Sequence, residues 1–108
     1  MEKIKIALTI PLAYANKIRK IIGKSEGGII GNYSHCSISS KVIGRFKPNE
    51  KANPHIGKRG KLSSVREEKI EFICSKDKAK SIINEIRKFH PYEELVLDIY
   101  PLVNEEDL

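Results

Sequence analysis

Three histidines and two cysteines are the residues of this 108-residue chain most suited to chemistry. Imidazole, thiolate and carboxylate groups are the ligands that divalent transition metals take in proteins. No two of these residues have a short ligand spacing such as His-x-x-x-His, so only the fold can assemble a metal site. In that case the expected metal ligands are His35, His90 and Glu93. The alternative is that both histidines are structural and bond backbone groups at the ends of a strand and a helix.

These candidate residues form no recognisable catalytic arrangement in the sequence. Cys36 follows His35 directly, and adjacent residues of a strand point to opposite faces, so the pair is not a dyad. Tyr92, Glu93 and Glu94 offer acid and base groups, but no nucleophile is indicated beside them. We therefore expect a domain that binds a ligand and is not a complete enzyme.

The net charge of +6 comes entirely from the middle of the chain. Residues 41–69 carry nine Lys or Arg against three Glu, and the other residues carry eleven charges of each sign. Such a segment attracts anions, with a solvated surface loop as the alternative. Nucleic acid is disfavoured, because Phe46 is the only aromatic residue there and stacking platforms are lacking. Lys58 and Arg59 are the cations expected to meet a small anionic ligand.

The spacing of apolar residues predicts six regular elements in the order β-α-β-β-α-β. Alternating apolar residues from Ile4 to Ile10 are typical of a strand. Pro11 opens a helix, Ser75 caps a second one, and Pro91 ends it. The expected strands are residues 3–10, 32–46, 65–74 and 95–102.

This order predicts an α+β ferredoxin-like fold, in which a four-stranded antiparallel sheet carries both helices on one face. Residues 1–103 form the expected single domain, with a long basic loop at 47–64 and an acidic tail at 104–108. The other face of the sheet stays bare, although its strands carry apolar side chains, so we expect self-association to cover it. The residues expected on that face include Tyr33, Ile73, Val96 and Tyr100.

Composition excludes several other classes of protein. No apolar run approaches the ~18 residues that a membrane span needs, and residues 1–10 lack the apolar core of a signal peptide. A cytoplasmic protein with no membrane contact is therefore expected. In that compartment Cys36 and Cys74 are expected to be reduced thiols.

Four motifs resemble the insert domain of the YqfO, or Nif-three-like, family. They are Gly28–Ser39, Gly44–Pro48, Ala52–Gly57 and His90-Pro91-Tyr92-Glu93-Glu94, and they match in order over nearly the whole chain. In that family the insert resembles the trimeric CutA and PII signalling proteins, which implies a homotrimer. The family's dinuclear metal site lies in flanking domains, which we expect this chain to lack as a stand-alone chain, so the resemblance does not imply hydrolase activity.

Together these observations favour a regulatory or small-ligand-binding domain with clefts between the subunits of a trimer. The alternatives are a CutA-like protein that binds divalent metal and a partner of a larger Nif-three-like metalloprotein. No cofactor is identified beyond a divalent metal. We expect His35, His55, His90 and Glu93 to converge, with His90 held protonated by the dipole at a helix C-terminus. The predicted ligand-binding residues are Asn32, Tyr33, His35, Cys36, His55, Lys58, Arg59, His90, Tyr92, Glu93 and Glu94.

Overall fold

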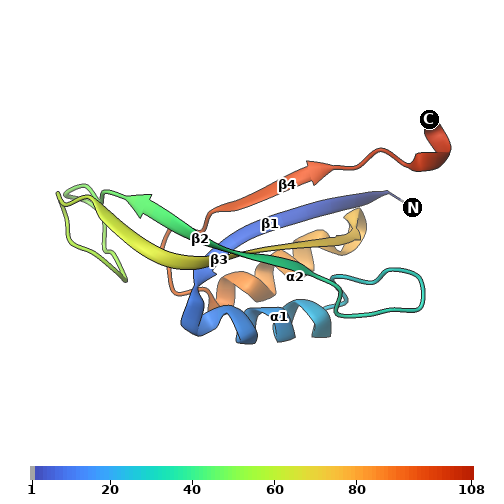
Figure 1. Ribbon diagram of the computed structural model, residues 1–108, viewed down its shortest axis with the longest axis horizontal. Helices are drawn as coiled ribbons and strands as arrows, with labels where there is room; N and C mark the ends of the chain where they lie inside the picture. The colour runs from blue at the N-terminus through green and yellow to red at the C-terminus, as the bar shows by residue number, and fades with distance from the viewer. Residues whose placement is uncertain (1) are drawn as a thin grey trace.

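The computed structural model describes residues 2–108 and has the predicted order of elements (Figure 1). Two short 3-10 turns, η1 (Leu12–Tyr14) and η2 (Glu105–Asp107), accompany the six main elements. The strands are β1 (Lys3–Pro11), β2 (Ile38–Phe46), β3 (Ser63–Ser75) and β4 (Leu97–Pro101), and the helices are α1 (Ala15–Lys24) and α2 (Lys76–Phe89).

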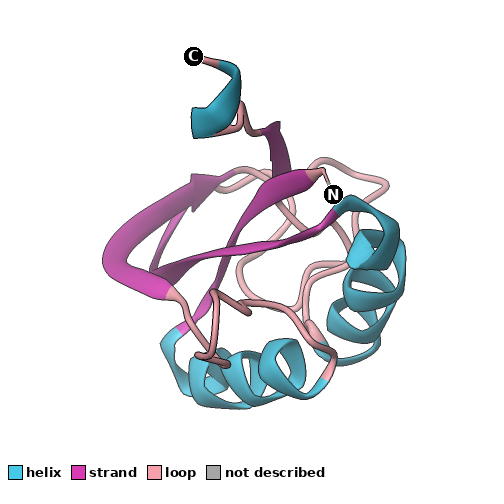
Figure 2. Cartoon of the chain, turned by 90° about the vertical axis from the view of Figure 1, so that its right-hand side faces the viewer, coloured by secondary structure: helices cyan, strands magenta, loops and turns pink. Residues whose placement is uncertain are grey.

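The four strands form one antiparallel sheet in the order β2-β3-β1-β4. Both helices lie on the same side of this sheet, and the other side is bare (Figure 2). Ile6 of β1 pairs with Phe72 of β3 and with Ile99 of β4, which fixes the register across the centre. This arrangement confirms the ferredoxin-like α+β fold.

The core lies between the sheet and the two helices. Alternate residues of β1 and β3 point toward the helices, as the two-residue period of a strand requires. They meet isoleucines that recur every three to four residues along α1 and α2. The largest fully buried side chains are Ile6, Leu8, Ile10, Ile18, Ile70, Ile82 and Ile86.

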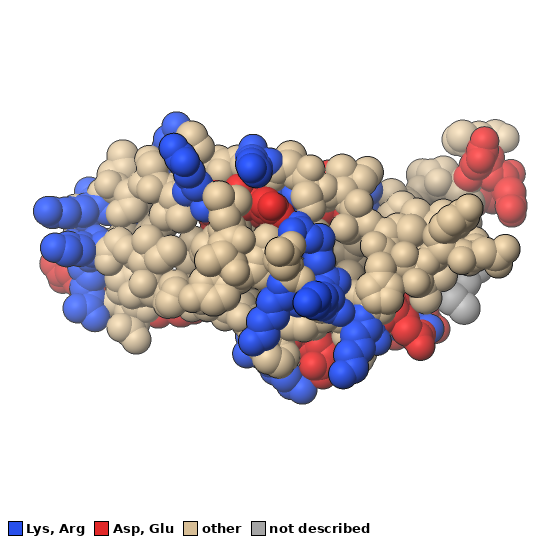
Figure 3. All heavy atoms as spheres, turned by 60° about the horizontal axis from the view of Figure 1, so that its bottom comes forward, with Lys and Arg blue, Asp and Glu red and all other residues tan. Residues whose placement is uncertain are grey.

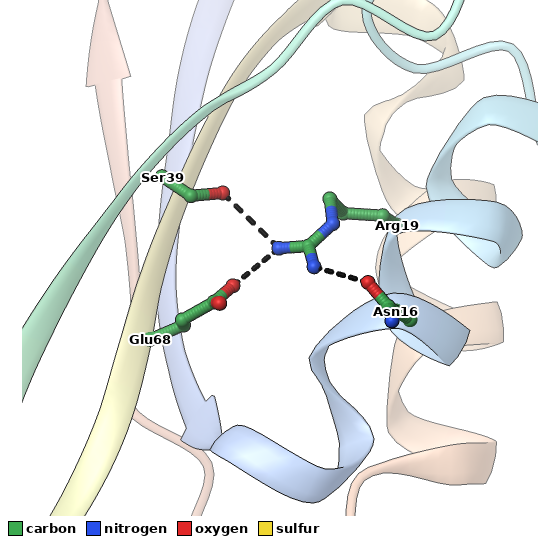
Figure 4. Close-up of polar contacts among 4 residues, drawn as sticks. All are labelled: Asn16, Arg19, Ser39 and Glu68. Atoms are coloured by element: carbon green, nitrogen blue, oxygen red, sulfur yellow. Dashed lines mark hydrogen bonds and ion pairs between the residues drawn. The ribbon is translucent and has the colours of Figure 1, made fainter.

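A polar cluster ties α1 to the sheet (Figure 4). Arg19 of α1 forms an ion pair with Glu68 of β3 and donates a hydrogen bond to Ser39 of β2, at 3.2 Å. Asn16, one turn earlier in α1, accepts a second bond from the same guanidinium. These contacts cross three elements and so orient the helix against the β2–β3 pair.

The predicted second strand is six residues too long at its N-terminal end. Residues 32–37 form a loop, because Gly28, Gly31 and His35 have positive φ angles, and His35 (59°) is not glycine. A left-handed residue ends regular strand pairing. Tyr33 consequently lies off the sheet, which corrects its predicted place on the bare face.

Other boundaries differ by fewer residues. The basic loop ends at residue 62, because β3 begins at Ser63, and β4 is limited to Leu97–Pro101. A 3-10 turn separates Pro11 from α1, and Ser75 precedes α2 without a capping bond from its side chain. The acidic tail contains η2 and is exposed throughout.

The bare side of the sheet, which we call the open face, carries the other alternate residues of each strand. By register it presents Ile38 and Val42 of β2 and Tyr100 of β4, with Ile73 of β3. Ile38 is 68% exposed and Tyr100 is 45% exposed. These apolar side chains alternate with Lys and Glu, so the open face is a mixed surface with apolar positions.

Candidate functional site

A hollow of about 880 Å³ lies at one end of the open face. Its floor is the strand surface around Gly44, Glu67 and Thr9, and its walls are the 47–62 loop and the segment that joins α2 to β4. Pockets of ~300–1,000 Å³ are typical of small-molecule sites. We call this feature the open-face hollow, and its lining includes Val42, Phe46, Lys47, Lys51, Pro54, His55, Ile56, Lys69, Tyr92, Glu93, Glu94, Val96 and Asp98.

Glu67 is the buried charged residue at the floor of the open-face hollow. It is only 5% exposed. Gly44 makes room for it: a Cβ atom at position 44 would lie 1.8 Å from Glu67 Oε1. Buried carboxylates are normally paired, because burying one without a partner is costly. A partner for Glu67 is therefore expected close by.

Tyr92 lies next to this carboxylate. Burial and then the neighbouring Glu67 carboxylate raise the pKa of the Tyr92 phenol. A side-chain hydrogen bond between the Tyr92 hydroxyl and Glu67 contributes to this rise in pKa. The floor of the hollow therefore holds a buried acceptor and a buried hydroxyl that lie against each other.

His90 supports the segment that carries Tyr92, and it does not line the open-face hollow in the described structure. Its Nε2 atom is 2.8 Å from the Thr9 carbonyl oxygen, and its Nδ1 atom accepts a 3.2 Å bond from the Tyr92 backbone N–H. Burial lowers the pKa of His90, more strongly than the Thr9 contact raises it. This corrects the expectation that the helix dipole keeps His90 protonated. Both ring nitrogens are engaged, so His90 positions Tyr92.

Aromatic rings continue from Tyr92 along the wall. The Phe46 and His55 rings each lie 6.4 Å from the Tyr92 ring, centroid to centroid, and Tyr14 lies 6.1 Å from His55. The Tyr14 hydroxyl and His55 Nε2 are 3.4 Å apart. Such faces and edges offer stacking surfaces to a planar ligand.

A carboxylate of the segment between α2 and β4 binds the backbone of the 47–62 loop. Both oxygens of Glu93 accept the Asn53 backbone N–H, at 3.0 and 3.1 Å. Arg59 donates from Nε to the Ala52 carbonyl at 2.6 Å, so this predicted ligand residue braces the loop. Arg59 lines a separate, smaller depression. Lys58 is exposed and lines neither that depression nor the open-face hollow.

Charge is divided between the walls of the open-face hollow. The cations Lys47 and Lys51 come from the loop, whereas the carboxylates Glu94 and Asp98 come from the segment leading into β4 and from β4 itself. Lys and Arg side chains also gather at the loop end of the molecule and over the helices (Figure 3). Arg45 of β2 and Lys69 of β3 also line the hollow, so an anionic group finds counter-charges on the loop and on the strands.

The remaining predicted residues lie at the other end of the sheet, in the loop between α1 and β2 (Figure 1). The His35 ring packs on Gly23 near the end of α1, where a Cβ atom would be 2.0 Å from it. Asn32 and Tyr33 are exposed and Cys36 is half-buried. The structure thus brings His55, Tyr92, Glu93 and Glu94 together at the open-face hollow. It separates them from the predicted site residues in the loop between α1 and β2.

No three His, Cys, Asp or Glu side chains within residues 2–108 are grouped so that they could hold a metal ion. His35, His90 and Glu93 in particular do not meet within one chain. Cys36 and Cys74 are both free thiols, and burial raises the pKa of Cys74. None of the helices in the described part has the length and hydropathy that a membrane crossing needs.

Sequence reasoning missed Gly44 and Glu67, which form the floor. Gly44 stands inside a strand, where a glycine often marks a close approach of another group. That signal was available in the sequence. Glu67 had no comparable signal, because it is one of two adjacent glutamates in a strongly charged segment.

The architecture is that of a ferredoxin-like α+β domain, and CutA proteins have the same fold. CutA from Archaeoglobus fulgidus superposes with a TM-score of 0.70 and 17% identity, covering 98% of this chain and 91% of that one. The PII-like protein CutA from Nostoc sp. PCC 7120, in apo form, superposes with a TM-score of 0.67 and 13% identity. That match covers 99% of this chain and 84% of the Nostoc chain. Identities this low establish the shared fold alone.

Closer similarity is found to one segment of larger proteins. The GTP cyclohydrolase 1 type 2 homologues of Halalkalibacterium halodurans and Bacillus subtilis are 43% and 44% identical over 101 and 98 residues. These matches cover 94% and 91% of this chain but only 27% and 26% of the relatives, so the chain spans about a quarter of their length. No protein-family model matches the chain.

A solved structure agrees with these matches. A Bacillus cereus protein related to NIF3 superposes with a TM-score of 0.84 and 38% identity, covering 95% of this chain and 26% of that one. The chain is therefore homologous to one segment of the Nif-three-like proteins, and the resemblance seen in its motifs is confirmed.

Proposed function

We propose that this chain is a non-enzymatic domain that binds a small ligand in the open-face hollow and acts in regulation. The observation that carries the proposal is the open-face hollow itself, about 880 Å³ in volume, with aromatic and cationic walls and the buried Glu67 carboxylate at its floor. A hollow of this size with a few polar groups among apolar walls is typical of a small-molecule site. The homologous proteins carry a cyclohydrolase name, but the chain covers about a quarter of them.

An enzymatic role has less support from the residues of the hollow. His90, the buried histidine nearest to it, has both ring nitrogens engaged. His55 is exposed on the loop beside Tyr14, and neither free thiol lines the hollow in the described structure. A hydrolytic site needs a positioned base and either a nucleophile or a metal.

We also propose that the chain forms a homotrimer through the open face. Two features support this: the exposed apolar side chains of the open face, such as Ile38 and Tyr100, and the fold shared with CutA. In a closed ring one surface of each subunit meets a different surface of the next. The hollow opens on the same side of the sheet, so a neighbouring subunit would convert it into a cleft between subunits.

One set of measurements tests both proposals. Light scattering at micromolar concentration should give about three times the 12.3 kDa chain mass. Calorimetric titration with inorganic phosphate, ATP, GTP and Zn²⁺ should detect binding of at least one of these probes. Lys51→Ala, on the wall, should weaken binding of an anion, whereas Lys61→Ala, in the same loop but outside the hollow, should not. A monomer contradicts the trimer, and no binding of any probe contradicts the binding role.

A further inference from the structure

Opposite charges follow the two edge strands of the sheet. The strand β2 forms one edge, and the 47–62 loop that follows it carries five Lys or Arg against one Glu. The strand β4 forms the other edge, and residues 90–108 around it carry six Asp or Glu with no Lys or Arg. Three of these acids lie in η2, at the opposite end of the molecule from the 47–62 loop (Figures 1 and 3). Complementary charges steer two molecules together and decide which surfaces meet.

The last seven residues, which we call the 102–108 segment, lack partners for their charges in their own chain. All of them are exposed, and among the described residues no ion pair involves Glu105, Glu106 or Asp107. Val103 and Leu108, on either side of these acids, are 76% and 95% exposed. Apolar side chains next to charged ones have the composition of an interface, in which a polar rim surrounds an apolar part.

The 47–62 loop offers the matching surface. Lys47 and Lys51 are exposed on the wall of the open-face hollow, and neither forms an ion pair with another described residue. Pro54 and Ile56 line the same hollow, and Leu62 at the end of the loop is 73% exposed. The loop therefore combines cations with apolar surface, as the 102–108 segment combines carboxylates with apolar side chains.

The two surfaces point away from each other within one chain. The strand β4 begins beside the open-face hollow, which Asp98 lines, and runs away from it to Pro101. The 102–108 segment continues to the far end of the longest axis, which measures 49 Å (Figure 1). Fully extended, a segment of this length spans at most about 25 Å. It would have to reverse direction after Pro101 to approach the loop of its own chain, whereas a neighbouring copy can meet it as it stands.

We infer that the 102–108 segment of one copy binds the 47–62 loop of the next copy. Its carboxylates pair with the cations of the loop, and Val103 and Leu108 lie toward the apolar wall of the open-face hollow. This inference rests on the proposed homotrimer and names one contact that holds it together. The contact joins two different surfaces, so it repeats from copy to copy and can close into a ring. In each copy, the neighbouring subunit then forms one side of the hollow.

Reversal of charge on the two surfaces tests the contact. Each variant should weaken self-association about 10-fold or more, measured by sedimentation equilibrium, because like charges then face each other. A chain that carries both sets of changes should return to within about 3-fold of the parent, because opposite charges face each other again. The segment variant is Glu105→Lys/Glu106→Lys/Asp107→Lys, and the loop variant is Lys47→Glu/Lys51→Glu/Lys58→Glu.

The matched control reverses three exposed charges on the helices, which lie on the other side of the sheet. Lys20→Glu/Lys24→Glu/Lys80→Glu changes the net charge as much as the loop variant does. Self-association of this control should stay within about 3-fold of the parent, because surface substitutions outside a contact have small effects. A loss as large as that of the loop variant would show a general effect of net charge and would overturn the inference.

Cross-linking shows whether the contact lies between copies or within one, and it needs no variant. An equal mixture of unlabelled and nitrogen-15-labelled parent chain is treated with a carbodiimide, which joins a carboxylate directly to an amine. Residues 105–107 should become linked to Lys47, Lys51 or Lys58 in peptide pairs that combine both isotopes. Pairs that never mix isotopes place the segment on its own loop, and the absence of such links separates the two surfaces; either result overturns the inference.

The outcomes separate the inference from the homotrimer on which it rests. A parent chain that sediments as a monomer overturns both. A trimer that the segment variant leaves intact overturns the contact alone. So does a chain that carries both sets of changes, remains folded by circular dichroism and fails to recover. Recovery together with mixed-isotope links supports the contact.

Discussion

The two faces of β3 both bury side chains, but those side chains differ in chemical character. Toward the helices, Ile70 and Phe72 are 0% and 2% exposed and belong to an apolar core. Toward the open face, Glu67 is almost as buried, but it is charged and lies beside the buried Tyr92 hydroxyl. Burial of the first kind lowers the free energy of folding, whereas burial of the second kind raises it. This contrast is one of the observations that support the proposed binding role of the open face.

Truncating the helix-side core should produce the largest effect on stability. Ile6→Ala removes a fully buried side chain at the centre of the sheet, so the free energy of unfolding should fall by about 2–5 kcal/mol. Val42→Ala, a half-buried open-face residue of β2, should cost less than about 1 kcal/mol. Urea unfolding measures both. Equal losses of unfolding free energy would show that the two faces contribute alike to stability, and this result would contradict the contrast drawn between them.

Adding a methyl group at Gly44 should produce the next largest effect. Gly44→Ala places a Cβ against Glu67 Oε1, and overpacking of this kind costs about 1–3 kcal/mol. Glu67→Ala removes the obstacle, so the double variant should lose less stability than the two single losses added together. Thermal or urea unfolding of the four proteins gives the coupling energy. Simple additivity would mean that the two positions do not touch.

The elements around the core could be predicted from sequence because their signals are local. The alternation through β1 and the three-to-four-residue spacing in α2 each report a buried face, and both elements were found close to their true bounds. The start of β2 was misplaced because the alternation of Cys36 and Ile38 with serines was extended back to residue 32. Only the backbone reveals the positive φ of His35 that interrupts the strand.

Only part of the candidate site could be predicted. Motif residues such as His55, Tyr92 and Glu93 do line one hollow, but His35 and Cys36 lie at the far end of the sheet. Sequence separation gives no measure of distance across an antiparallel sheet, since β2 runs from one end to the other. Glu67 was missed because its importance comes from burial, and burial of a charged residue is a property of the assembled fold.

Replacing the buried carboxylate should raise stability modestly. Glu67→Gln removes a buried charge, and it keeps the shape and an acceptor for the Tyr92 hydroxyl, so the free energy of unfolding should rise by about 1 kcal/mol. Glu71→Gln should stay within about 0.5 kcal/mol, because Glu71 is less buried and lies 3.9 Å from Lys69. A gain in stability together with a loss of ligand binding is the signature of a functional residue. A clear loss of stability would instead give Glu67 a structural role and weaken the contrast between the faces.

His90 should give the smallest effect, seen as a dependence of stability on pH. Burial lowers the pKa of His90 below its ordinary value of 6.5, although the Thr9 carbonyl and Glu67 oppose this and Arg87 reinforces it. The unfolded chain then binds a proton more readily than the folded one as the pH falls below about 6.5. The stability contribution of neutral His90 is therefore complete above that pH and is lost progressively as the pH falls below it.

Melting temperatures measured between pH 7.5 and pH 5 test this behaviour. His90→Gln retains one donor and one acceptor but does not titrate, so its decline toward pH 5 should be shallower than that of the parent. His55→Gln is the matched control, because this exposed ring has a single polar contact among the described residues, 3.4 Å from the Tyr14 hydroxyl, and its replacement should leave the decline in place. If the parent and His90→Gln decline in parallel, His90 does not carry the pH dependence. A shallower slope would instead show that a residue of the helix-to-β4 junction stabilises the floor of the hollow through its neutral ring.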